Sequence, residues 1–165
     1  MNRIAVVDSS PLISLMYLGL ASELPAFFDR VLVPRAVHRE VNKKGRFRYR
    51  LKKLYESGFY RKCTVGDLTN VQLLRDKLDE GEAEALIQAQ EMAVAYFIGD
   101  EKKAREIGTI FHLKCVGTVR LLGRLNREGR AEEPRTLVRK LRRSLQFRVS
   151  DQVVKEAIEM AAEPI

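Results

Sequence analysis

Short, continuous apolar runs alternate along the chain with longer segments in which apolar residues recur every three or four positions. Such runs are typical of strands buried on both faces, as in a parallel sheet covered by helices. The runs lie at residues 4–7, 31–33, 95–99 and 112–116, with a more irregular strand at 59–65. Helical spacing, interrupted at Gly19 and Gly81, lies at residues 12–24, 35–41, 68–78, 82–93, 102–107, 119–125, 134–146 and 151–162. This alternation predicts an α/β fold in which right-handed crossovers join parallel strands.

The size and composition of the chain suit one domain. With 165 residues, 45% of them hydrophobic, it can bury a sizeable core, and no linker-like stretch divides it. We therefore expect a single domain over residues 1–165, with C-terminal helices from about residue 130. The apolar runs are too short to cross a bilayer and the N-terminus lacks signal-peptide features, so we expect a cytoplasmic protein without membrane association. Cys63 and Cys115, distant in sequence and in apolar surroundings, are predicted to be buried free thiols.

The charge of the chain points to a polyanionic partner. Its net charge is +8 and its pI is near 9.7. The densest basic stretch, residues 43–53, also contains two aromatic residues, a mixture that suits single-stranded nucleic acid. The alternative is an amphipathic surface helix whose apolar residues face the core, and both interpretations can hold together. The RNA-binding residues predicted in this stretch are Lys43, Lys44, Arg46, Arg48 and Arg50.

Polar residues occupy equivalent places beside several predicted strands. Asp8, Asp100 and Thr118 each follow an apolar strand run and precede a helix. Because the carboxyl ends of parallel strands share one edge of a sheet, these residues can converge there. Glu40 and Glu82 begin within reach of the same edge on their helices. Clustered carboxylates repel one another, and a divalent cation that prefers hard oxygen ligands, Mg²⁺ or Mn²⁺, would offset that repulsion.

Each acid taken alone also has a structural interpretation. Asp8 could be a turn residue, Asp100 a helix N-cap, and Glu40 a solvated acid paired with a neighbouring arginine. Glu82 and Glu84 could simply complement a helix dipole, and two residues two positions apart point to different sides of a helix. Together with a basic surface, however, the set favours a metal-dependent nuclease that cleaves phosphodiesters.

Five short motifs follow one another along the chain. They are Val6-Val7-Asp8-Ser9-Ser10-Pro11-Leu12-Ile13, Pro34-Arg35-Ala36-Val37-His38-Arg39-Glu40, Leu78-Asp79-Glu80-Gly81-Glu82-Ala83-Glu84-Ala85, Asp100-Glu101-Lys102-Lys103-Ala104-Arg105 and Gly117-Thr118. On these motifs the chain resembles the PIN-domain family, in the branch related to VapC ribonuclease toxins. The resemblance runs from residue 4 to about residue 150. It implies a single PIN-like domain, an α/β/α arrangement of a parallel sheet flanked by helices.

The resemblance also implies roles for individual residues. The four acids that match the family's metal-binding and catalytic positions are Asp8, Glu40, Glu82 and Asp100. Ser9 and Thr118 match hydroxyl positions that assist the metal or its water. Glu101 replaces the family's second Asp with a longer side chain, and Glu84 belongs to the same motif as Glu82. His38 and His112 are expected to be structural.

These features imply a metal-dependent endoribonuclease that hydrolyses single-stranded RNA with Mg²⁺ or Mn²⁺ and leaves 5′-phosphate and 3′-hydroxyl ends. The resemblance further implies the toxin of a VapBC-like toxin–antitoxin pair, a homodimer, and inhibition by an antitoxin that covers the acidic site. A basic RNA- or protein-binding module with an inactive PIN fold is the alternative, and the presence of all four acids argues against it. A Rossmann-like nucleotide-binding switch is disfavoured because no G-x-G-x-x-G motif follows the first strand.

Overall fold

Five short parallel strands form the central sheet of the computed structural model, which describes residues 2–165. Their order across the sheet is β3-β2-β1-β4-β5, so the N-terminal strand lies in the middle. In the register of the sheet, Val6 of β1 lies opposite Leu32 of β2 and Phe97 of β4. The strands are β1 (Ile4–Val7), β2 (Arg30–Pro34), β3 (Tyr60–Cys63), β4 (Tyr96–Ile98) and β5 (Lys114–Val116).

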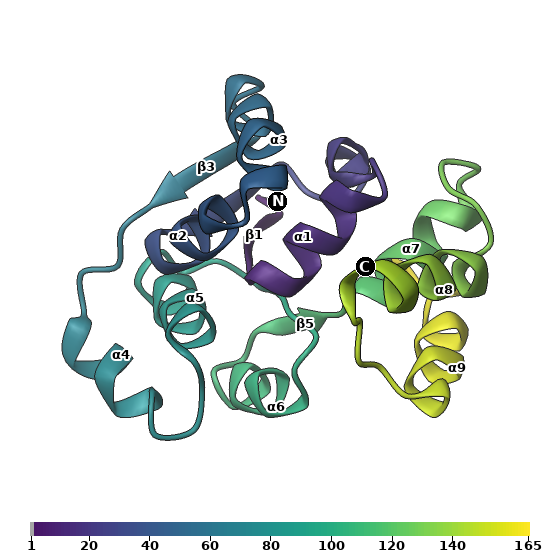
Figure 1. Ribbon diagram of the computed structural model, residues 1–165. Helices are drawn as coiled ribbons and strands as arrows, with labels where there is room; N and C mark the ends of the chain where they lie inside the picture. Colours follow the sequence, from purple (N-terminus) through teal and green to yellow (C-terminus); the bar gives the residue numbers. More distant parts are fainter. Residues whose placement is uncertain (1) are drawn as a thin grey trace.

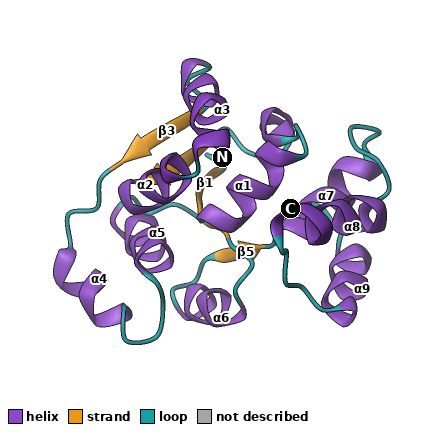
Figure 2. Ribbon diagram, viewed as in Figure 1, coloured by secondary structure: helices purple, strands orange, loops and turns teal. Residues whose placement is uncertain are grey.

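Helices connect the strands and lie on both sides of them, as Figure 2 shows. Figure 1 shows that α7, α8 and α9 gather at one side of the molecule, and that α2, α4 and α5 lie at the other. A short 3₁₀ helix, η1 (Ala21–Ala26), precedes β2. The helices are α1 (Ser9–Tyr17), α2 (Arg35–Lys43), α3 (Gly45–Glu56), α4 (Leu68–Leu74), α5 (Glu80–Glu91), α6 (Lys102–Ile110), α7 (Thr118–Arg127), α8 (Pro134–Leu145) and α9 (Asp151–Met160).

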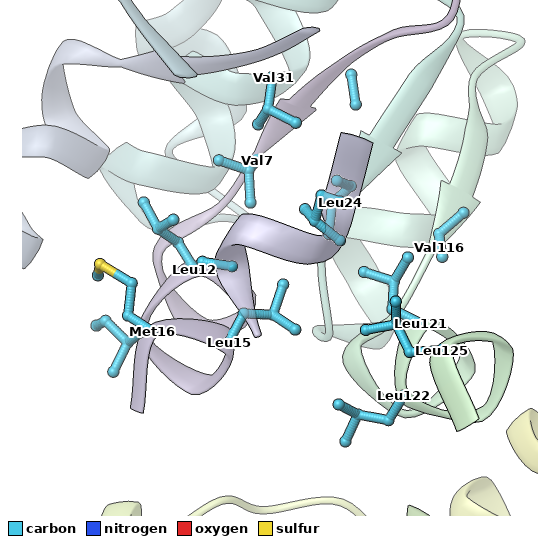
Figure 3. Packing of buried hydrophobic residues seen from close by; sticks show 14 of the residues in the cluster. Val7, Leu12, Leu15, Met16, Leu24, Val31, Val116, Leu121, Leu122 and Leu125 are labelled. Atoms are coloured by element: carbon cyan, nitrogen blue, oxygen red, sulfur yellow. The ribbon is translucent and has the colours of Figure 1, made fainter. Parts of the chain in front are cut away.

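Successive side chains of β1 point to opposite faces of the sheet, and each face carries its own apolar core. Val7 belongs to the larger core, in which the apolar sides of α1, α2, α3, α7, α8 and α9 pack together. Figure 3 shows Val7 and Val31 of the sheet above Leu12 and Leu15 of α1 in this core. Val6 belongs to the second core, which α4, α5 and α6 cover. The two cores give the α/β/α layers, and the predicted fold class is confirmed.

The C-terminal helices are part of this fold because they pack on α7. Gly123 of α7 lies so close to α9 that a Cβ atom there would stand 2.6 Å from the Cβ of Ala161. A glycine is therefore required for α7 and α9 to approach this closely. The helices predicted at 134–146 and 151–162 correspond to α8 and α9, whose apolar residues join the larger core.

The structure corrects several local expectations. Gly81 does not interrupt a helix but lies in the first turn of α5, and the helix predicted over 68–78 ends at Leu74. Cys63 and Cys115 are free but half-buried, not fully buried, and partial burial raises the pKa of the Cys63 thiol to about 12. Within residues 2–165, no helix has the length and apolar character needed to span a membrane.

Candidate functional site

The carboxyl ends of the central strands open into a cavity of about 880 Å³ whose lining is rich in carboxylates. Asp8 follows β1 directly and occupies the N-cap position of α1, and Asp100 follows β4 after a single glycine. Glu40 comes from α2 and Glu82 from the first turn of α5. The structure thus brings the four predicted acids to one cavity, which two further acids also line. The six acidic lining residues are Asp8, Glu40, Asp79, Glu82, Asp100 and Glu101.

Asp8, Ser9 and Glu40 form the most closely connected part of this cavity. The Ser9 hydroxyl donates a hydrogen bond of 2.7 Å to Oε2 of Glu40 and lies 3.5 Å from Oδ1 of Asp8. A Cβ atom at Gly81 would stand 3.3 Å from Oδ1 of Asp8 and 3.5 Å from Oε2 of Glu40. The absence of a side chain at Gly81 therefore lets the first turn of α5 lie directly against both carboxylates.

Burial and repulsion from neighbouring acids raise the pKa values of Asp8 and Glu82. Asp8 is only 3% exposed, and burial raises its pKa well above the usual value, with further increases from Asp79, Glu82 and Glu40. Burial likewise raises the pKa of Glu82 to about 7, with repulsion from Asp79 as the next cause. No ion pair neutralises Asp8 or Glu82 among residues 2–165, so the acids create a field that would attract a cation.

Glu82 has a structural role beside its place in the cavity. Its Oε2 accepts a hydrogen bond of 3.1 Å from the backbone N–H of Asp79, whose Oδ1 accepts one of 2.8 Å from the backbone N–H of Glu82. This reciprocal pair is a capping box, and it satisfies two free amide groups at the start of α5. The structural and the functional interpretation of Glu82 are therefore compatible.

Asp100 is held by hydroxyl and amide donors instead. Its carboxylate accepts hydrogen bonds from the backbone N–H and the hydroxyl of Thr118, at 2.8 and 2.7 Å, and from the Ser10 hydroxyl at 3.3 Å. Burial raises the pKa of Asp100, and these hydrogen bonds together with Arg105 oppose the shift. Asp100 is not a helix N-cap, because Glu101 occupies that position of α6. Thr118 is fully buried and orients Asp100 without itself lining the cavity.

Glu84 faces away from the cavity, as its offset from Glu82 predicts. It is buried, and its Oε1 accepts a hydrogen bond of 3.1 Å from the backbone N–H of Ala36 in the first turn of α2. A carboxylate at that place satisfies a free amide and complements the helix dipole. His38 contacts the Tyr55 hydroxyl at 2.9 Å through Nδ1. His38 and His112 are both outside the cavity lining.

The predicted basic patch divides into two groups. Lys44 and Arg46 line the cavity. Arg50 instead donates a 2.6 Å hydrogen bond to the carbonyl oxygen of Met16, and Nε of Arg48 donates one of 3.3 Å to the carbonyl of Asn42. Lys43 is exposed at the end of α2, outside the lining. The amphipathic interpretation of this segment is confirmed, because Phe47 and Leu51 are buried in the larger core and Leu54 is half-buried against it.

Three parts of the cavity were not anticipated from the sequence. Asp79 lies within the third motif, and its position three residues before Glu82 was the available signal for a capping box. Ser10 contacts Asp100 from the first turn of α1. Residues 144–150, at the end of α8 and in the segment that follows it, form one wall, and no local sequence signal connects them with the ends of β1 and β4.

The donor atoms of the cavity fit a hard divalent cation. Within residues 2–165, no three acidic, histidine or cysteine side chains are grouped closely enough to enclose a metal ion by themselves. A Mg²⁺ site, however, usually keeps several waters and uses only one or two carboxylates. The two carboxylates best placed for such a site are those of Asp8 and Glu40. Both lie beside Gly81, and the Ser9 hydroxyl lies between them, within 3.5 Å of each.

A parallel α/β/α sheet whose carboxyl edge gathers acids from separate elements has the nuclease-type fold of the PIN domain. A family model described as a PIN domain matches residues 4–163, and the chain belongs to the PIN-domain family. PIN domains are generally nucleases, and they typically use divalent metal ions. No curated protein matches the sequence.

Proposed function

We propose that this protein is a metal-dependent endoribonuclease that hydrolyses single-stranded RNA with Mg²⁺ or Mn²⁺. The observation that carries the proposal is the convergence of Asp8, Glu40, Glu82 and Asp100, from four separate segments, on one cavity. Buried acids with raised pKa values are costly to the fold, and such groups cluster at functional sites. Family membership supports a hydrolase acting on nucleic acid.

Each proposed residue has a task that its contacts support. Asp8 and Glu40 would hold the cation, with Ser9 orienting Glu40 through its short hydrogen bond. Asp100 would act from the end of the neighbouring strand, β4, kept in position by Thr118. Glu82, with its pKa raised to about 7, can hold or release a proton near neutral pH. When bound, the divalent ion would supply charge neutralisation for the phosphate and an activated water.

Lys44 and Arg46 would bring the substrate to these acids. Both line the same cavity, and neither takes part in an ion pair within residues 2–165. Arg46 stacks against the rings of Tyr17 and Phe47, 5.3 and 5.1 Å from their centroids, which fixes its guanidinium group. A fixed, unpaired guanidinium is well suited to contact a phosphate.

The biological setting that we propose follows the resemblance to VapC toxins. We propose one domain over residues 1–165 that acts in the cytoplasm as a homodimer and as the toxin of a toxin–antitoxin pair. An antitoxin segment that covers the acidic cavity would inhibit it, and such a segment would need cationic groups to complement the six acids.

The test is incubation of the purified protein with end-labelled single-stranded RNA in Mg²⁺, in Mn²⁺ and in EDTA. We expect endonucleolytic products with 5′-phosphate ends in either metal and intact RNA in EDTA. RNA binding without cleavage in both metals would reject the nuclease proposal and favour the alternative, a basic binding module with an inactive PIN fold.

A further inference from the structure

One part of the cavity wall is built by the segment between α8 and α9. Residues 146–150, here called the connector, line the cavity together with Ser144 and Leu145 at the end of α8 and Val153 of α9. Facing the same cavity from the α2–α3 junction are Lys44, Arg46 and Phe47. These two segments therefore add basic and apolar residues to a cavity that the acids also line.

Several contacts hold the connector in place. Gln146 ends α8 in the left-handed conformation, with φ of 53°, and turns the chain toward the cavity. Phe147 is anchored in the larger core. Arg142 donates hydrogen bonds to the Val149 carbonyl and, at 2.9 Å, to Oδ1 of Asp151. A wall fixed from several directions is preorganised to bind a ligand, because little conformational entropy remains to be lost.

The wall is also tied to the α1 side of the cavity. The Tyr17 hydroxyl donates a 2.7 Å hydrogen bond to Oγ of Ser144, and the Tyr17 ring carries the guanidinium group of Arg46. Arg148 stands on the connector with an exposed side chain that makes no ion pair or side-chain hydrogen bond among residues 2–165. Arg46 and Arg148 thus face one cavity from segments distant in the sequence.

We propose that the connector and the α2–α3 junction form the two walls of a binding site for one unpaired RNA strand. Arg148 and Arg46 contact backbone phosphates, and the apolar lining receives a base of the strand. The apolar lining residues are Ile13, Phe47, Leu145, Phe147, Val149 and Val153. This inference rests on the nucleic-acid substrate of the proposed function and adds the C-terminal wall to the surface that recognises it.

Two observations favour an unpaired strand as the ligand. The cavity volume, about 880 Å³, falls within the roughly 300–1,000 Å³ range of pockets that enclose small ligands, which suits a nucleotide segment. Apolar side chains that line a cavity together with cationic groups can contact a base only when that base is free of its partner.

The experiment measures binding of a fluorescent RNA oligonucleotide in EDTA, where cleavage does not interfere. Arg148→Ala should weaken binding of single-stranded RNA roughly threefold to tenfold, as for loss of one solvent-exposed hydrogen bond. It should also reduce the slope of log affinity against log salt by about 0.7, as for one phosphate contact on a single strand. Arg148→Glu should weaken binding more. Arg143→Ala is the matched control, since it removes an exposed arginine of α8 that does not line the cavity.

The ligand is identified by comparing the affinities of three RNA molecules of equal length. They are a single strand, the same strand in a duplex, and a single strand without bases. We expect the single strand to bind most tightly and Arg148→Ala to affect it most. Equal losses for Arg148→Ala and Arg143→Ala, or no loss for either, would overturn the assigned wall. If the abasic strand binds as tightly as the unmodified single strand, the proposed contact with a base is wrong.

These outcomes are separate from those of the cleavage test. Cleavage in Mg²⁺ combined with unchanged binding by Arg148→Ala would reject the wall and leave the nuclease standing. Arg148-dependent binding without cleavage in either metal would support the wall and reject the nuclease. Thermal unfolding of each variant checks that the fold is unchanged, which we expect because Arg148 is exposed.

Discussion

Asp8 is buried at the start of α1 beside three other acids, where its charge is costly to the fold unless a cation is present. We expect Asp8→Asn to reduce metal-dependent RNA cleavage by about a hundredfold or more, because a neutral amide replaces an anionic ligand. The same substitution should raise the thermal midpoint in EDTA above pH 7, since it removes one member of a repelling cluster. Cleavage rates in Mg²⁺ and Mn²⁺ and melting curves in EDTA check both expectations. If Asp8→Asn cleaves RNA at the wild-type rate, Asp8 is not a catalytic residue.

Glu82 and Glu84 provide a comparison between a cavity acid and a structural acid. Glu82→Gln retains an oxygen acceptor for the capping box, so we expect an intact α5 and a large loss of cleavage. Glu84→Gln keeps an acceptor for the Ala36 amide but loses the charge at the start of α2. It should lower the free energy of unfolding by up to about 1 kcal/mol and leave kcat within about twofold. Single-turnover cleavage and urea unfolding of both variants distinguish the two residues. Lost cleavage in Glu84→Gln with only lost stability in Glu82→Gln would mean that Glu84 is the catalytic acid and Glu82 the structural one.

At the scale of the elements, α3 carries arginines with different tasks on neighbouring turns. Arg46→Ala should weaken RNA binding and leave stability nearly unchanged, because Arg46 lines the cavity and is exposed. Arg50→Ala should lower the free energy of unfolding by about 1 kcal/mol with little effect on affinity, because it removes the hydrogen bond that fastens α3 to α1. RNA binding in EDTA and urea unfolding of both variants check this. Equal losses of affinity would mean that the whole basic face of α3 binds RNA.

The elements were largely predictable because their signals are local. The apolar runs around Val6 and Phe97 identified buried strands, and the residues that follow each strand could be assigned to one edge of a parallel sheet. That assignment was sufficient to predict that Asp8 and Asp100 lie at one cavity, as they do in the structure.

What the sequence could not provide was the tertiary packing. The position of the connector depends on the packing of α8 and α9 on α7 through Gly123, which no nearby residue indicates. In the same way, the basic composition of α3 did not separate Arg46 from Arg50, because the carbonyl that Arg50 contacts belongs to a different helix.

At the scale of the whole molecule, an acidic cavity lies within a strongly basic protein. The net charge of +8 attracts a polyanion from every direction, whereas the cavity carries six acids that repel it. The cationic residues that line the same cavity are Lys44, Arg46, Lys102, Arg105 and Arg148, and they offset part of this repulsion. We expect the strand to bind through these cations, and its phosphate to approach the acids only with a divalent cation between them.

This arrangement makes stability depend on pH and metal together. The pKa of Glu82 is raised to about 7 from an ordinary value of 4.5, and that of Asp8 is raised well above its ordinary value of 3.8. Between these ordinary and raised values the folded state binds more protons than the unfolded state. The free energy of unfolding must then fall as pH rises, because its slope against pH follows the difference in bound protons.

We therefore expect the metal-free protein to lose roughly 3 kcal/mol of unfolding free energy through Glu82 between about pH 4.5 and 7.5, with a further loss through Asp8. Glu82→Gln should flatten this fall, because the amide does not titrate. Mg²⁺ or Mn²⁺ should offset it at pH 7.5 by about 2.7 kcal/mol at a hundred times the dissociation constant, and much less at pH 5, where protons compete for the same carboxylates. Urea unfolding at both pH values, with EDTA and with each metal, measures these changes in the free energy of unfolding. A wild-type protein as stable at pH 7.5 as at pH 5 in EDTA, and indifferent to both metals, would show that the acids of this cavity neither repel one another nor hold a cation.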